Sequence, residues 1–160
     1  MRTIILGVLI LFFALGSGTA AWARLGETED QLVQRYGKPF LKQRFAWCVK
    51  DNFNVQGFSI VVTLLNGISV GESYRISSGS LTDFEVVELL DANCQGYSWD
   101  EVPANEIPKE IFHPVKQMWR RPNGSTAIST GTSIEFKSID LLMAEENANK
   151  PPPAPSTAGF

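Results

Sequence analysis

Residues 58–77, FSIVVTLLNGISVGESYRIS, decide the expected fold of this 160-residue chain. Apolar side chains occupy alternate positions in both halves of the stretch, starting at Phe58 in the first half and at Ile68 in the second. Alternation with a period of two is typical of an antiparallel sheet that is covered on one face and wet on the other. Asn66-Gly67 joins the halves, and both residues tolerate positive φ, so they predict a two-residue type I′ turn. The stretch therefore predicts a β-hairpin.

Further alternating segments extend the predicted sheet, and two capping boxes predict helices beside it. The additional strands are expected at RFAWCVK (44–50), KQMWRR (116–121), STAIST (125–130) and TSIEFKSI (132–139). Thr28 with Gln31, and Thr82 with Glu85, are the residue pairs of capping boxes. The second helix is expected to bury the stripe Phe84, Val87, Leu90 and Cys94.

These elements predict an α+β fold, with an antiparallel sheet of about six strands and two short helices packed on one face. A helix followed by a hairpin with Asn-Gly occurs twice, starting near Thr28 and near Thr82. A tandem helix–hairpin repeat is therefore one form that this fold can take.

The second hairpin is predicted around Pro122-Asn123-Gly124. A two-residue turn would need an amide hydrogen that Pro122 lacks. We therefore expect a type I turn followed by Gly124 in the left-handed region, which is a three-residue loop with a G1 bulge. Trp119 is expected in the core and Arg121 at the rim of the sheet. Stacking of Trp119 on a ligand is the alternative.

The N-terminal segment has the three-part composition of a secretory signal peptide. Arg2 precedes the apolar run IILGVLILFFAL (4–15), and small residues follow up to Ala21-Trp22-Ala23. The run is shorter than the ~20 residues of a membrane-spanning helix. We expect residues 1–23 to be a signal peptide cut after Ala23, which makes the mature chain secreted or periplasmic, without a membrane span.

The rest of the chain is expected to form one domain and a tail. Residues 24–142 are long enough for a single α+β domain with one core. Residues 143–160 include the run KPPPAP and predict a disordered, proline-rich tail. Removal of residues 1–23 takes away only Arg2 among the charged residues and leaves 13 basic and 17 acidic ones. This acidic balance offers no basic surface for nucleic acid.

The opening of the predicted domain, Gly26-x-Thr28-x-x-Gln31-Leu32-x-x-x-x-Gly37-x-Pro39, resembles the start of the SmpA/OmlA-type module. This helix-then-sheet module occurs in an outer-membrane assembly lipoprotein, and a related doubled form occurs in beta-lactamase inhibitory proteins. The whole chain also looks like small, uncharacterised secreted bacterial proteins with "GETE" and "RYGKP" elements and a Trp-Arg-Arg hairpin. The chain lacks the lipidated cysteine of the assembly lipoprotein. The resemblance implies a non-catalytic domain that binds through its sheet or loops.

Few residues offer chemistry. Cys48 and Cys94 can form a disulfide in an oxidising compartment, or each can pack as a small buried hydrophobe. His113 is the only histidine, and with Cys48 as nucleophile it would make a thiol-dependent hydrolase, with the loop 97–115 as a lid. No metal-ligand motif, calcium loop or phosphate-binding loop occurs, so we expect no cofactor and no metal.

The remaining candidate site is the open face of the predicted sheet. That face is expected to carry Ser59, Thr63, Ser69, Ser73, Arg75, Arg120, Glu135 and Lys137. Of these, Arg75, Arg120 and Lys137, together with Trp119, are the candidate binding residues. The sequence favours a secreted or periplasmic, non-enzymatic interaction module that binds an unidentified protein or glycan of the cell envelope. The hydrolase and a purely structural envelope protein are the alternatives.

Overall fold

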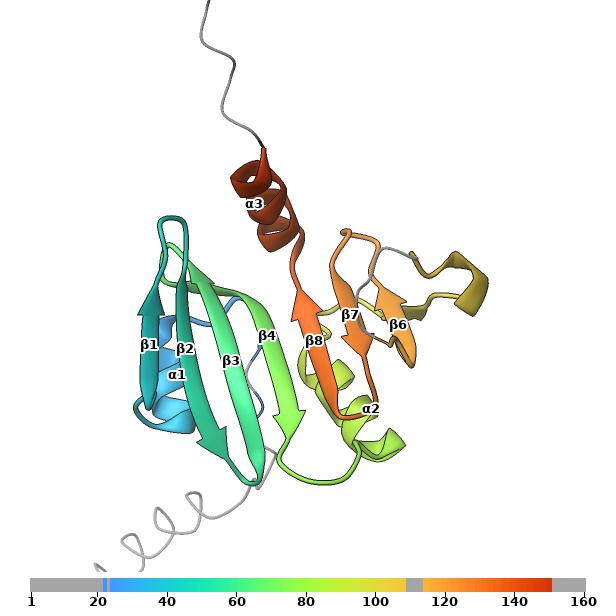
Figure 1. The fold of residues 1–160 in the computed structure, drawn as a ribbon, viewed down its shortest axis with the longest axis horizontal. Helices are drawn as coiled ribbons and strands as arrows, with labels where there is room; N and C mark the ends of the chain where they lie inside the picture. The colour runs from blue at the N-terminus through green and yellow to red at the C-terminus, as the bar shows by residue number, and fades with distance from the viewer. Residues whose placement is uncertain (1–21, 23, 109–113, 151–160) are drawn as a thin grey trace, which may run out of the picture.

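The computed structural model describes Trp22 and residues 24–108 and 114–150 (Figure 1). These residues have an α+β fold that consists of one antiparallel eight-stranded sheet, three α-helices and a short 3-10 helix. The elements in chain order are α1 (Glu29–Tyr36), β1 (Leu41–Arg44), β2 (Val49–Val55), β3 (Phe58–Leu65), β4 (Ile68–Ile76), α2 (Asp83–Ala92), β5 (Asp100–Glu101), η1 (Ala104–Glu106), β6 (Gln117–Arg120), β7 (Thr126–Ser129), β8 (Ser133–Lys137) and α3 (Ile139–Asn149).

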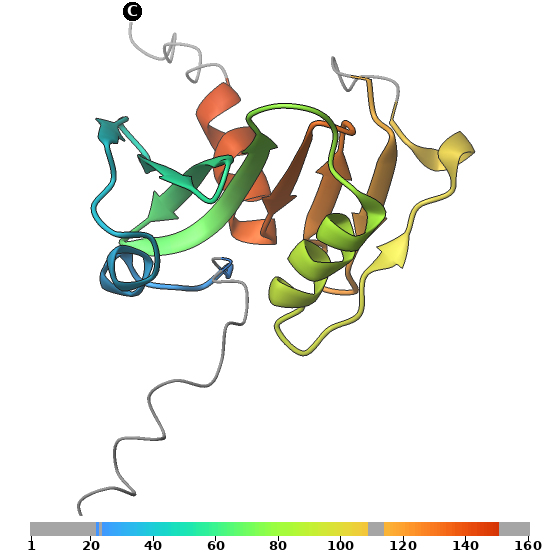
Figure 2. The same ribbon diagram turned by 90° about the horizontal axis from the view of Figure 1, so that it is seen from below.

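The sheet consists of two antiparallel meanders that meet in the middle. The strand order is β1-β2-β3-β4-β8-β7-β6-β5, so the last strand of each meander pairs with the last strand of the other. One α-helix followed by four strands therefore occurs twice along the chain. Helices α1 and α2 lie on one face of the sheet, and α3 lies on the other (Figure 2). We call the face that α1 and α2 cover the helix face, and the other the open face.

The sheet has more strands than the predicted six because the segment 44–50 was assigned wrongly. Residues 45–48 form the turn between β1 and β2 rather than a strand, and Phe45 and Trp47 are exposed there. The second additional strand, β5, has only two residues and lies in the segment 97–115, which the sequence analysis treats as a loop. Two residues are too few for alternation to show in β5, and in β1 all four residues are exposed or half-buried, so no apolar alternation marks the strand.

Both predicted capping boxes are present. The Thr28 hydroxyl accepts the Gln31 amide, and the Gln31 side chain accepts the Thr28 amide. The same reciprocal pair joins Thr82 and Glu85. Each pair satisfies amides that have no partner within the helix, so both helices begin where the sequence predicted.

The predicted buried stripe of α2 is confirmed at Leu90 but is wrong at Phe84 and Val87. Phe84 is 70% exposed and Val87 is 53% exposed. The stripe that faces the sheet consists instead of Val86, Leu89, Leu90 and the capping residue Asn93. Leu81 and Val86, at the two ends of the first turn, are both buried, which sets the rotation of the helix at its start.

The two predicted turns are confirmed. Asn66 and Gly67 have φ values of 51° and 80°, as a type I′ turn requires. In the second hairpin, the Gly124 amide donates to the Arg121 carbonyl at 2.9 Å, and Gly124 has a φ of 87°. Trp119 lies in the core, as predicted. Arg121 does not reach the rim, because it is buried on the same face.

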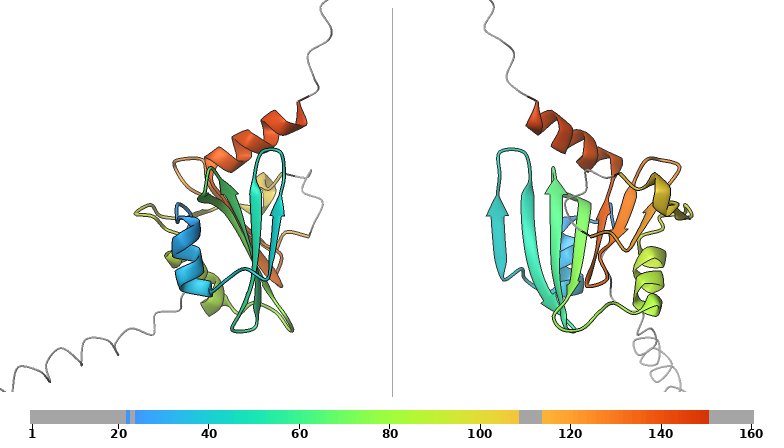
Figure 3. Two further views of the ribbon diagram at one scale, coloured as in Figure 1. Left: turned by 90° about the vertical axis from the view of Figure 1, so that its left-hand side faces the viewer. Right: turned by 45° about the vertical axis from the view of Figure 1, so that its right-hand side comes forward.

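Helix α3 extends into the predicted tail. Ser138 accepts the Leu141 amide as its N-cap, and the helix continues to Asn149. Its one buried residue, Leu141, rests against Gly71 of β4, where no side chain occupies the open face. The helix lies at the end of the sheet where β8 finishes (Figure 3). Residues 143–149 are therefore helical rather than disordered, and 151–160 lie outside the described residues.

Candidate functional site

Cross-strand pairing arranges the side chains of the open face in rows. Two rows are mainly polar, and the row between them also carries the apolar residues Val61, Ile128 and Met118. One row, the Arg75 row, consists of Asn54, Ser59, Arg75 and Ser133. Another, the Lys137 row, consists of Lys50, Thr63, Gly71, Lys137, Thr126 and Arg120. Four positions along β4 separate the two rows, which is about 13 Å at 3.3 Å per residue.

The predicted binding residues therefore do not form one cluster. Arg120 and Lys137 lie in the same row with Thr126 between them, and Arg75 belongs to the other row. Trp119 lies on the helix face and is buried. Only the three cationic residues share the open face.

Ser69, expected on the open face, also points to the helix face. The pairing of β3 with β4 shifts register between Thr63 and Leu64, so that Ser69 pairs with Leu64, a core residue. One extra residue in a strand reverses the facing of the residues on one side of it. The alternation in the sequence does not reveal this bulge, because Ser69 and its neighbours alternate without interruption.

Helix α3 covers part of the Lys137 row. Lys137 Nζ lies 3.0 Å from a Glu145 carboxylate oxygen on α3 and 3.7 Å from Glu135 on its own strand. A hollow of about 210 Å³ remains between α3 and the sheet, with Lys50, Ser73 and Glu145 among its lining residues. Lys137 is therefore engaged by carboxylates within the chain.

The Arg75 row is uncovered. Asn54 and Arg75 are exposed, and Ser59 and Ser133 are half-buried. Within the described part of the chain, Arg75 has no carboxylate within ion-pair distance. Arg120 is likewise exposed and outside the ion pairs of the described residues, but it belongs to the row that α3 partly covers. The Arg75 row therefore offers a cation among neutral hydrogen-bonding groups with no helix over it.

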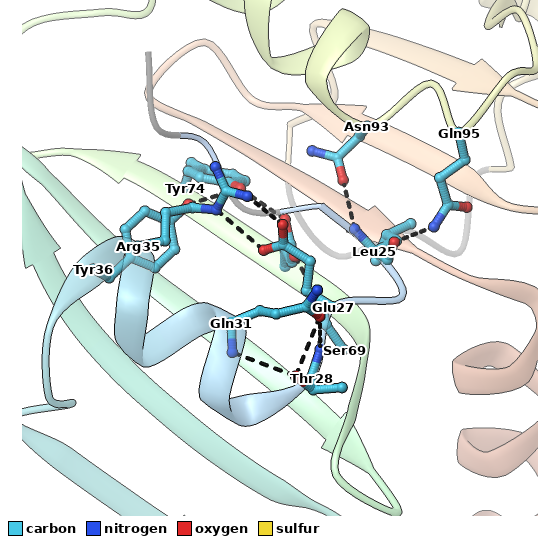
Figure 4. Close-up of polar contacts among 11 residues, drawn as sticks. Leu25, Glu27, Thr28, Gln31, Arg35, Tyr36, Ser69, Tyr74, Asn93 and Gln95 are labelled. Atoms are coloured by element: carbon cyan, nitrogen blue, oxygen red, sulfur yellow. Dashed lines mark hydrogen bonds and ion pairs between the residues drawn. The ribbon is translucent and has the colours of Figure 1, made fainter. Parts of the chain in front are cut away.

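The helix face buries a polar network that the sequence reasoning missed (Figure 4). Glu72 is 1% exposed, and its carboxylate accepts hydrogen bonds from Ser69 Oγ at 2.9 Å and Tyr74 Oη at 2.7 Å. Burial, with a smaller effect from the nearby Glu27 carboxylate, raises the pKa of Glu72 to about 7. The sequence indicates this burial, because Glu72 lies between Val70 and Tyr74 at a position where the alternation expects an apolar residue.

The same network ties the N-terminal segment to the two helices. Glu27 pairs with Arg35 of α1, whose Nε donates to Glu27 Oε2 at 3.2 Å. Asn93, at the end of α2, accepts the Leu25 amide at 3.1 Å. Figure 4 shows these contacts, together with Gln95 donating to the Leu25 carbonyl. The network is enclosed and joins elements, which is a structural role.

Arg121 is a buried cation on the helix face. Its guanidinium lies 3.9 Å from the centre of the Trp99 ring, and Nη1 donates to Gln95 at 3.1 Å. Trp99 is itself held by a hydrogen bond from its indole N–H to the Leu90 carbonyl at 2.9 Å. Burial lowers the pKa of Arg121. Stacking on Trp99 thus positions Arg121 under α2, away from the open face.

The two cysteines are free thiols, so the disulfide that the sequence left open is not formed in the structure. Cys48 is buried beside the β1–β2 turn, and burial raises its pKa, which disfavours the thiolate that a nucleophile needs. Cys94 follows α2 and lines a hollow with Val87 and Tyr97. His113 lies outside the described residues, so its predicted partnership with Cys48 stays a prediction.

Two further observations concern metals and membranes. Among the residues that the structure describes, no three histidine, cysteine or acidic side chains come together as metal ligands. In the same part of the chain, no helix has the length and apolar character needed to cross a membrane.

The fold places the chain in a broad class: α+β proteins with a wide antiparallel sheet and helices packed against it. No protein-family model matches the chain, and no curated protein does. Two solved structures match, including that of a cysteine-rich secretory protein (SAV1118) from Staphylococcus aureus subsp. aureus Mu50. The two sequences are 12% identical, the TM-score is 0.48, and the match covers 74% of this chain and 46% of that one. The chain thus spans about half the length of that protein.

Proposed function

We propose that this chain is an exported, non-enzymatic interaction protein that binds another protein of the cell envelope through the Arg75 row of its open face. The observation that carries the proposal is the uncovered Arg75, which is exposed and has no carboxylate partner in the described chain. Asn54, Ser59 and Ser133 supply neutral hydrogen-bonding groups beside it. A partner that brings a carboxylate to Arg75 and backbone groups to its neighbours fits this surface.

Export is supported by the composition of residues 1–23, which is that of a signal peptide. The resemblance of residues 26–39 to the SmpA/OmlA-type module adds a second reason, since it implies binding through the sheet or loops. The raised pKa of Cys48 argues against the hydrolase alternative.

Site-directed photo-crosslinking in the native envelope tests the proposal. A photoreactive amino acid at Ser59, beside Arg75, is expected to capture one defined protein. The same probe at Gln34, which is exposed on α1 behind the sheet, is the matched control and is expected to capture none. Equal capture from both positions, or none from Ser59, would reject the open face as the binding surface.

A charge variant makes the test specific to Arg75. Arg75→Ala removes one charged hydrogen-bond donor and should weaken affinity for the captured protein by about tenfold or more. Lys38→Ala, an exposed cation outside the sheet, should leave the affinity unchanged. Thermal unfolding of both variants is compared with that of the wild-type protein, to show that the fold is intact.

A further inference from the structure

Trp22 and residues 24–28 are part of the folded domain. The backbone of this segment pairs with the β3–β4 hairpin: the Gly26 amide donates to the Ser69 carbonyl at 2.7 Å, and the Ser69 amide donates to the Glu27 carbonyl at 2.8 Å. Thr28 forms an isolated antiparallel bridge with Ile68. These bonds hold the segment against the edge of the helix face (Figure 4).

Trp22 fills a place in the hydrophobic core. Its side chain is 8% exposed. Its ring centre lies 4.8 Å from that of Phe58 and 5.7 Å from that of Tyr74, with interplanar angles of 83° and 85°. These are edge-to-face contacts, the arrangement that aromatic pairs prefer. Trp22 therefore belongs to the core of the first half of the sheet.

This packing conflicts with a signal-peptide cut after Ala23, because that cut would remove Trp22. The leader contains other bonds that meet the same small-residue requirement. A cut after Ala21 has Thr19 and Ala21 at the two small positions, and a cut after Ala20 has Gly18 and Ala20 there. Either of these cuts leaves Trp22 in the mature chain.

We infer that the signal peptidase hydrolyses the chain on the N-terminal side of Trp22, at the Ala21–Trp22 or the Ala20–Ala21 bond, so that the mature protein keeps Trp22 as a core residue. Hydrolysis consumes one water, and it leaves a carboxylate on the released leader and an amino group on the first mature residue. The inference rests on the export that forms part of the proposed function, and it is independent of what the open face binds.

The intact mass of the exported protein tests the inference. The full-length chain is produced with its own leader in an export-competent bacterial host and purified from the envelope or the medium. The expected mass corresponds to a chain that begins at Ala21 or Trp22. A mass that begins at Arg24 overturns this inference and leaves export standing, whereas a retained Met1 overturns both.

Stability measurements supply the second readout. Trp22→Ala, with its cut position checked by mass, is expected to lower the midpoint of thermal unfolding by about 10 °C, since a buried tryptophan is lost. Trp47→Ala removes a tryptophan from the β1–β2 turn, where the side chain is exposed, and is the matched control. An unchanged midpoint for Trp22→Ala would overturn the inference.

Discussion

Glu72 shows how a carboxyl group can be accommodated in an apolar position. Val70 and Tyr74, two positions before and after Glu72 in the sequence, are both buried. The hydroxyls of Ser69 and Tyr74 donate to the carboxyl group, which offsets part of the cost of removing it from water. The remaining cost appears as a pKa of about 7. Asp51 is a second fully buried carboxyl group; burial raises its pKa, and Lys42 Nζ lies 3.4 Å from it.

The pKa of Glu72 predicts a pH-dependent cost to stability. Because its pKa in the folded protein lies above the ordinary value of 4.5, the folded state binds this proton more tightly than the unfolded state. Tighter proton binding by Glu72 therefore stabilises the folded state fully below about pH 4.5. This stabilisation is lost as the pH rises to about 7, where the folded protein must bury a charged carboxylate. Glu72→Gln should raise the free energy of unfolding at pH 8 by about 3 kcal/mol relative to the wild-type protein, measured by urea denaturation.

The comparison between the two proteins across pH is the decisive part of this measurement. The stabilisation by Glu72→Gln should shrink towards zero between pH 7 and about pH 4.5, since the wild-type carboxyl group becomes protonated over that range. Glu135→Gln, at a half-exposed carboxyl group on the open face, is the matched control for replacing a carboxyl group by an amide. A pH-independent difference for Glu72→Gln would contradict the assignment.

At the scale of elements, α3 is held against the sheet mainly by one buried contact, that of Leu141 with Gly71. Leu141 is the only buried residue of the helix, and its side chain has room there because position 71 is glycine. A Cβ atom at that position would come within 2.3 Å of Leu141 Cδ2, far inside contact distance. The ion pair between Lys137 and Glu145 is the second tie between the helix and the sheet.

Gly71→Ala should therefore loosen α3 without unfolding the sheet. Leu141 is displaced, whereas alanine is no worse than glycine in a strand. Hydrogen exchange of the α3 amides should become at least tenfold faster, while amides of β3 and β4 keep their protection. Arg75→Ala, on the same strand and face but away from the contact of Leu141 with Gly71, is the control. Unchanged exchange in α3 would show that Leu141 is not its anchor.

At the scale of the whole molecule, the two meanders share one core. Strands β4 and β8 pair over five positions at the junction, and the rings of Tyr74 and Phe136 meet edge to face across it at 6.1 Å. The same cluster of buried residues includes Leu32 of α1 and Leu89 of α2. Burial in a shared core makes each half depend on the other.

The molecule is therefore expected to unfold as one cooperative unit. Far-UV circular dichroism and tryptophan fluorescence should give coincident urea transitions. Phe136→Ala should lower the free energy of unfolding by about 3–5 kcal/mol, and it should do so equally for amides of β3 and of β7 followed by hydrogen exchange. Val87→Ala, on the exposed side of α2, is the control. Loss of protection confined to the second half would contradict a shared core.

Sequence alone determined the features whose causes are local. Helix starts follow from capping pairs, and the two turns follow from residues that tolerate positive φ or lack an amide hydrogen. The alternating runs predicted an antiparallel α+β fold with a polar open face. Each of these features depends on residues a few positions apart, so it can be predicted from the sequence without knowledge of distant contacts.

Only the tertiary structure decided the features that depend on distant partners. The residues packed against each element set three such features: the rotation of α2, the bulge that turns Ser69 to the helix face, and the burial of Arg121. Packing also decides that Trp22 lies in the core and that Leu141 contacts Gly71. Packing of this kind joins residues far apart in the chain, and an alternating or helical pattern carries no record of those pairings.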